Sequence, residues 1–70
     1  MLSEYGKVKV TQIRGFYHVS IGIGGGEYYQ KIMNIRANAY SEAKWLRNCV
    51  KFGKHPQTII FNQGYTLQTI

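Results

Sequence analysis

Residues 38–53 carry an apolar stripe that is narrow enough to constrain the rest of the fold. Apolar side chains recur there at the helical period, so a helix would bury one face only. The stripe consists of Ala39, Ala43, Leu46 and Val50. Asn38 is a favourable N-cap residue, and Gly53 stands where glycine commonly follows the end of a helix. A helix with so narrow a stripe needs a sheet to cover it, so we expect strands elsewhere in the chain.

Three segments before this helix alternate between apolar and polar residues, which is the pattern of strands with one buried face. They are residues 7–13, 16–23 and 28–37. In the second segment, the face expected to lie under the helix carries Tyr17, Val19, Ile21 and Ile23. The Gly24-Gly25-Gly26 tract predicts a hairpin loop, because glycine adopts positive φ angles without strain. The three strands are therefore expected to form an antiparallel meander.

Two short segments with strand-like composition follow the helix, at residues 58–61 and 65–70. Asn62-Gln63-Gly64 lies between them and predicts a second hairpin. The expected order is β-β-β-α-β-β. We therefore predict an α+β fold, a small two-layer sandwich in which a three-stranded antiparallel meander is followed by one helix and a C-terminal β-hairpin. With 70 residues, the chain (1–70) is expected to be a single domain.

The charge balance points to an anionic partner. Nine Lys and Arg residues stand against three acids, which gives a formal net charge of +6. This charge repels itself in the compact state, and a bound anion relieves the repulsion. The cations are spread along the chain, so they belong to the folded body rather than to a tail. Nucleic acid is the commonest partner of such a protein, and an acidic protein surface comes next.

Catalysis and cofactor binding find little support in the residues. Only Glu4, Glu27 and Glu42 could serve as carboxylates, and their spacing implies no shared site. Two scattered histidines with Cys49 do not match the spacing of a zinc site. No apolar run approaches the roughly 18 residues that cross a membrane. We expect a protein that is not an enzyme, with no cofactor, metal or membrane, in a reducing cytoplasm that could equally be that of an infected host.

The outer face of the predicted sheet is the first candidate for a binding site. Cations there would neutralise phosphates, while aromatic rings would stack on bases or reach sugar edges. The candidate nucleic-acid-binding residues are Lys7, Lys9, Arg14, Phe16, His18, Tyr28 and Arg36. A solvated strand surface accounts for the same residues about equally well, because strands are rich in aromatic residues.

The predicted helix offers a second basic face opposite its apolar stripe. It consists of Lys44, Arg47 and Lys51, extended by Lys54. Most charged helix faces are simply solvated, so this one is expected to support the binding surface rather than form it. Because the helix covers one side of the sheet, its basic face and the outer sheet face are expected to point in opposite directions. The sheet face is favoured because only it adds aromatic rings.

The layout of residues 15–54, a strand meander followed by one helix, resembles that of AP2-type and integrase arm-binding DNA domains. The likeness includes the short run at residues 38–43 that opens the helix. In those families the sheet face lies in the major groove. The resemblance implies that the groove-reading residues here would be Arg14, Phe16, His18, Tyr28 and Arg36. The tryptophans and the arginine-rich first strand that are typical of AP2 domains are missing from this chain.

The chain also resembles phage-encoded accessory proteins, since it is short, basic and tyrosine-rich and has one cysteine. Many of those proteins bind and block a host protein. The alternative function is therefore a viral accessory protein that inhibits or adapts a host protein by binding an acidic surface of it. Exposed aromatic residues and sheet edges would make the contact, and a homo-oligomer could form through a sheet edge. Binding of nucleic acid, DNA or RNA, is the leading expectation.

Overall fold

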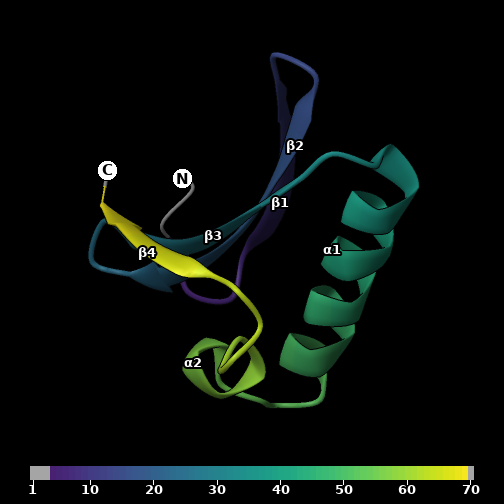
Figure 1. Cartoon of the computed structure of the whole chain (residues 1–70). Coiled ribbons are helices and arrows are strands. Elements are labelled where there is room, and N and C mark those ends of the chain that lie inside the picture. The colour runs from purple at the N-terminus through teal and green to yellow at the C-terminus, as the bar shows by residue number, and fades with distance from the viewer. Residues whose placement is uncertain (1–3, 70) are drawn as a thin grey trace.

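The computed structural model of the chain describes residues 4–69 (Figure 1). Four antiparallel strands form one sheet, and their order in the sheet, β1-β2-β3-β4, follows their order in the chain. The strands are β1 (Val8–Ile13), β2 (Phe16–Gly24), β3 (Glu27–Met33) and β4 (Thr66–Thr69). Between β3 and β4 the chain forms two helices, α1 (Arg36–Lys51) and the short α2 (Pro56–Ile59).

Tight turns join the strands of the meander, as the sequence predicts. Arg14 and Gly15 connect β1 to β2 with φ angles of 52° and 81°. Gly25 and Gly26 connect β2 to β3 with φ angles of 66° and 79°. Two-residue turns with positive φ at both positions match the right-handed twist of the strands that they join. The side chain of Arg14 therefore stands at the tip of a hairpin.

Helix α1 covers one face of the sheet and lies mainly over β1 and β2 (Figure 1). Three of the four residues in its predicted apolar stripe, Ala39, Ala43 and Leu46, have no exposed surface, and the fourth, Val50, is partly buried against the core. The strands contribute the rest of the main core, in which Val8, Val19 and Ile21 are buried. The α+β two-layer sandwich, built from a meander followed by a helix, is therefore confirmed.

The junction between β3 and α1 differs from the prediction. The third strand ends at Met33 rather than at residue 37, and the helix begins at Arg36 rather than at Asn38. Ile35 occupies the N-cap position, and no side chain caps the helix. Arg36 and Ala37 are strong helix formers, which favours this earlier start. Asn38 is therefore a residue of the first helical turn and not the N-cap.

The predicted C-terminal hairpin does not form, because residues 58–61 are not a strand. Pro56 begins α2 instead, and proline is favoured at the first position of a helix. Ile59 and Ile60 are buried against the core and complete it near β2. Residues 66–69 of the last predicted strand are confirmed as β4, which pairs with β3. Ile70 lies outside the described residues.

Candidate nucleic-acid interface

The outer face of the sheet, opposite α1, holds part of the predicted site. Strand pairing and alternation place the side chains of Lys9, Phe16, His18 and Tyr28 on this face. Lys7 lies just before β1, and its carbonyl oxygen accepts a hydrogen bond from the backbone N–H of Gly22 at 2.9 Å. These five residues are therefore on or beside the predicted surface.

Two of the predicted residues do not lie on the outer face. Arg14 occupies the turn between β1 and β2, beyond the paired part of both strands. Arg36 was expected in the third strand, but it is the first residue of α1 because that strand ends at Met33. Its guanidinium carbon lies over the ring of Tyr40, 5.7 Å from the ring centroid. The outer face therefore holds fewer cations than the sequence predicts.

The outer face is also more apolar than predicted at the end nearest the first hairpin turn. Ile13 pairs with Phe16 across β1 and β2, and Ile32 pairs with His18 across β2 and β3. Cross-strand neighbours of this kind pack against each other. We call Ile13, Phe16 and Ile32 the outer apolar patch; 47%, 50% and 59% of their surfaces are exposed. A contiguous exposed apolar patch is typical of a protein contact and not of a phosphate contact.

The basic side of α1 meets the edge of the sheet instead of pointing away from it. Nη2 of Arg47 donates a hydrogen bond to the backbone oxygen of Val8 at 3.2 Å. Val8 belongs to β1, which is an edge strand. Arg36, Lys44 and Lys51 share this side of α1 with Arg47 at the helical period. Arg47 therefore reaches the β1 edge of the sheet, so the basic side of α1 does not point wholly away from the sheet as expected.

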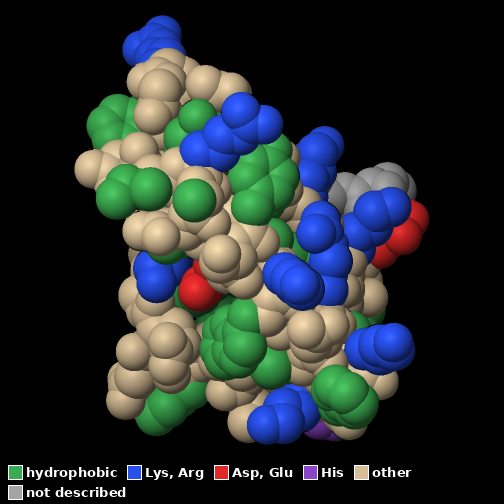
Figure 2. Space-filling model, turned by 90° about the vertical axis from the view of Figure 1, so that its right-hand side faces the viewer, with side chains coloured by type: hydrophobic (Ala, Val, Ile, Leu, Met, Phe, Trp, Pro, Cys, Tyr) green, Lys and Arg blue, Asp and Glu red, His purple; other side chains and the backbone are tan. Residues whose placement is uncertain are grey.

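Cations of α1 and of the β1 segment lie on the two sides of this border. We call this surface the basic flank. It consists of Lys7, Lys9, Arg36, Lys44, Arg47 and Lys51, and all of them are exposed. Figure 2 looks onto the side of the molecule where α1 lies, and Lys and Arg side chains gather mainly on the right-hand side of that view. The basic flank therefore combines residues that the sequence assigns to two separate sites.

Two of the three acids lie away from the basic flank. Glu42 is on the opposite side of α1, where its Oε2 lies 3.7 Å from Nζ of Lys31 in β3. Glu27 opens β3 and pairs with Thr69 of the other edge strand. Glu4 is the exception, because it precedes Lys7 by a single turn of the chain. The charge is thus unevenly distributed, and most of the excess positive charge lies on the β1 side of the molecule.

No family model, characterised protein or solved structure is significantly similar to this chain. The resemblance to DNA-binding domains is therefore one of layout and gives no family assignment.

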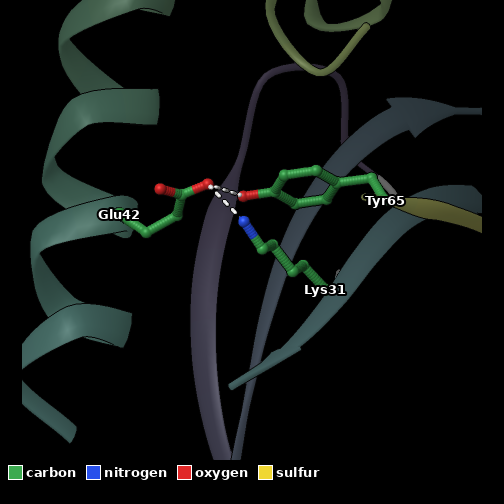
Figure 3. Close-up of polar contacts among 3 residues, drawn as sticks. All are labelled: Lys31, Glu42 and Tyr65. Atoms are coloured by element: carbon green, nitrogen blue, oxygen red, sulfur yellow. Dashed lines mark hydrogen bonds and ion pairs between the residues drawn. The ribbon is translucent and has the colours of Figure 1, made fainter. Parts of the chain in front are cut away.

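A polar cluster of Lys31, Glu42 and Tyr65 lies on the other side of α1 and is structural (Figure 3). Tyr65 donates its hydroxyl to Oε2 of Glu42 at 2.7 Å, and Nζ of Lys31 lies 5.7 Å from the centroid of the Tyr65 ring. Burial raises the pKa of the Tyr65 hydroxyl far above its ordinary value, and the bond to Glu42 raises it further. A phenol held in its protonated form links secondary-structure elements but exchanges no proton near neutral pH.

The remaining reactive side chains lie apart from one another. Cys49 is a free thiol, half-buried against the core. His55 is hydrogen-bonded through Nδ1 to the hydroxyl of Tyr5 at 2.6 Å, and His18 is bonded to the side chain of Gln30. Within residues 4–69, His, Cys, Asp and Glu form no group of three or more that could hold a metal ion. Neither helix in that range is long and apolar enough to cross a membrane.

The prediction from the sequence includes every cation of the basic flank. It does not give their arrangement, and it does not include Tyr40. Tyr40 lies on the same side of α1 as Arg36 and Lys44, four residues from each. That spacing is visible in the sequence and indicates an exposed ring among cations. The meeting of α1 and β1 depends on how the helix crosses the sheet, which no local pattern reveals.

Proposed function

We propose that this protein binds nucleic acid, DNA or RNA, through the basic flank. The observation that supports the proposal is the collection of exposed cations along the border of α1 and β1, with two of the acids on other surfaces. Lys and Arg side chains arranged in this way neutralise backbone phosphates and release counterions, which drives binding to nucleic acid. This role fits the cytoplasmic location that the sequence predicts.

Arg47 would be the central phosphate contact. Its hydrogen bond to the backbone of Val8 holds the guanidinium at the border between helix and strand. Only one nitrogen is used in that bond, so other N–H donors are left for a phosphate oxygen. Lys44 and Lys51 lie about one turn before and after Arg47 on α1 and extend the contact along the helix.

Lys7 and Lys9 would continue the phosphate contact across the edge of the sheet. They flank Val8, whose carbonyl oxygen receives the bond from Arg47. The proposal moves the main binding surface from the outer sheet face to its margin. Phe16, His18 and Tyr28 then lie beside the bound strand instead of under it.

Charge-matched substitutions test this proposal. Lys44→Gln removes one cation from the basic flank, and Arg14→Asn removes one from the hairpin tip; asparagine tolerates the positive φ at that position. Binding of labelled oligonucleotides is measured by fluorescence anisotropy over a series of salt concentrations. We expect Lys44→Gln to weaken binding and to reduce the salt slope by about one, and Arg14→Asn to do neither.

Two results would count against the proposal. Equal weakening by both substitutions would mean that only net charge matters and that the basic flank is no site. No binding of any oligonucleotide by the unaltered protein at low salt would remove nucleic acid as the partner. The double variant Lys44→Gln/Lys51→Gln enlarges the expected effect to a slope change of about two.

The outer apolar patch favours a second function, the binding of a host protein. It presents an exposed Phe16 with two exposed isoleucines on the neighbouring strands β1 and β3. Aromatic side chains in such positions commonly anchor protein contacts. This function predicts a partner that stays bound after nuclease treatment. That partner should bind Lys44→Gln but not Phe16→Gln, and this result would favour protein binding over nucleic-acid binding.

A further inference from the structure

We infer that the nucleic acid on the basic flank is single-stranded and that Tyr40 stacks on one of its bases. This inference rests on the proposed function, because it names the class of nucleic acid bound by the same surface. It gives a role to an exposed aromatic side chain that phosphate binding alone does not use.

Tyr40 lies among the cations of the basic flank. On the surface of α1, Arg36 lies one turn before it and Lys44 one turn after it. The guanidinium of Arg36 sits over the Tyr40 ring at 5.7 Å from its centroid. The side chain of Tyr40 is still 49% exposed. A half-exposed ring that carries a cation over one face is suited to stack on a planar partner.

An unpaired base is the planar partner that fits this position. Inside a duplex, both faces of each base are stacked on neighbouring bases, so an exposed ring on a helix cannot reach them. In a single strand the bases are free to turn onto aromatic side chains while the phosphates meet nearby cations. Stacking of this kind tolerates any base, because every base has a π face. The inference therefore predicts strand selectivity with little preference for sequence.

The layout of the basic flank suits a strand that runs along α1. The helix has 16 residues and is therefore about 24 Å long. Tyr40 lies in its second turn, with Lys44, Arg47 and Lys51 following along the same side. A base stacked on Tyr40 would place the next phosphates of the strand over these three cations. Single-strand-binding modules commonly cover roughly 4–16 nucleotides, and the length of α1 suits the lower part of that range.

Fluorescence anisotropy with two probes tests the inference. The probes are a labelled oligothymidylate of about 12 nucleotides, which falls within the usual site sizes, and a blunt duplex of the same length. Tyr40→Leu removes the ring and keeps an apolar side chain, whereas Tyr40→Phe keeps the ring. Phe61→Leu is the matched control, because Phe61 is 72% exposed and has no Lys or Arg within four residues in the chain.

The unaltered protein is expected to bind the single strand more tightly than the duplex. Tyr40→Leu should weaken binding of the single strand about tenfold and leave the salt slope unchanged, because no cation is lost. Tyr40→Phe and Phe61→Leu should bind like the unaltered protein. Because Tyr40 is half exposed, Tyr40→Leu should fold normally, and a circular dichroism spectrum checks this.

The inference and the proposed function fail in different ways. If the duplex binds as tightly as the single strand, the basic flank binds nucleic acid without selecting single strands. If Tyr40→Leu binds normally while Lys44→Gln/Lys51→Gln is weakened, the basic flank binds nucleic acid without a base stacked on Tyr40. Either result overturns the inference and leaves the proposed function intact. If neither probe binds the unaltered protein at low salt, both are overturned together.

Discussion

The hydroxyl of Tyr65 donates a 2.7 Å hydrogen bond to Oε2 of Glu42, and this bond joins the residue just before β4 to α1. Nζ of Lys31 lies 3.7 Å from the same oxygen, so β3 takes part as well. β4 is a short edge strand of four residues, and its pairing with β3 is its main attachment to the sheet. The cluster of Lys31, Glu42 and Tyr65 therefore fixes the C-terminal part of the chain to the two-layer core.

Tyr65→Phe is expected to lower the free energy of unfolding by about 1–2 kcal/mol, because it removes a half-buried hydrogen bond to a carboxylate. Urea denaturation followed by circular dichroism measures the change. Tyr40→Phe removes a hydroxyl from an exposed tyrosine outside the cluster and is the matched control, with an expected change of a few tenths of a kcal/mol or less. Equal effects from the two substitutions would mean that the cluster adds nothing specific.

The same phenol is expected to make the protein sensitive to alkali. Burial, and after it the bond to Glu42, raise the pKa of Tyr65 in the folded state. Its stabilising effect is fully present below about pH 10, the ordinary pKa of tyrosine, because both states then keep the proton. Above that pH only the unfolded state releases the proton, so stability falls as the pH rises.

A comparison of two variants isolates this effect from the titration of other groups. The Tm of Tyr65→Phe is expected to fall less steeply between about pH 9 and pH 11 than the Tm of the unaltered protein, because the phenol is missing from both states. Tyr40→Phe again serves as the control. The same steepness in the unaltered protein and in Tyr65→Phe would contradict the assignment of the raised pKa to the folded state.

The central part of the fold was predictable because its signals are local. The alternation in β1 and β2 and the stripe of α1 are periodic patterns within short windows, and the glycine turn after β2 is a local composition signal. Residues 58–61 gave no such signal, since a short apolar run fits a strand or a buried helical turn equally well. Pro56, at the first position of α2, was the local sign that favours the helix.

The candidate site was predictable in its members but not in its arrangement. Lys44, Arg47 and Lys51 form an evident basic stripe, and Lys9 is evidently on the outer side of its strand. Whether the helix stripe lies beside β1 or beside β3 depends on the direction in which α1 crosses the twisted sheet. That direction follows from the packing of the whole core. The sequence of neither segment alone therefore predicts the hydrogen bond from Arg47 to Val8.

Gly6 is expected to be intolerant of alanine because it packs closely against α1. A Cβ atom at this position would lie 3.0 Å from Cγ1 of Val50, and the φ angle of Gly6 is 77°. Gly25 is the matched control, since its φ angle is 66° but nothing lies within 4 Å of an added Cβ atom. Gly25→Ala should lower the free energy of unfolding by about 1 kcal/mol, because of backbone strain alone. Gly6→Ala should cost about 2 kcal/mol or more, because the contact with Val50 adds to that strain.

A double variant separates the contact from the backbone strain at Gly6. Val50→Ala removes the methyl group that an added Cβ atom would meet. Gly6→Ala/Val50→Ala should therefore be more stable than the sum of the two single effects predicts, as measured by urea denaturation. Additive effects would show that the 3.0 Å approach relaxes without cost.

Arg47 connects the fold to the proposed function, because its guanidinium is bonded to the backbone of Val8 although the residue as a whole is exposed. Arg47→Lys keeps the charge, but a lysine ammonium cannot reproduce the fork of donors that would hold Val8 and a phosphate together. We expect this variant to bind oligonucleotides several-fold more weakly with an unchanged salt slope. Arg47→Gln should weaken binding further and reduce the slope by about one. If Arg47→Lys binds like the unaltered protein, Arg47 acts only as a point charge, and its bond to Val8 does not prepare it for phosphate.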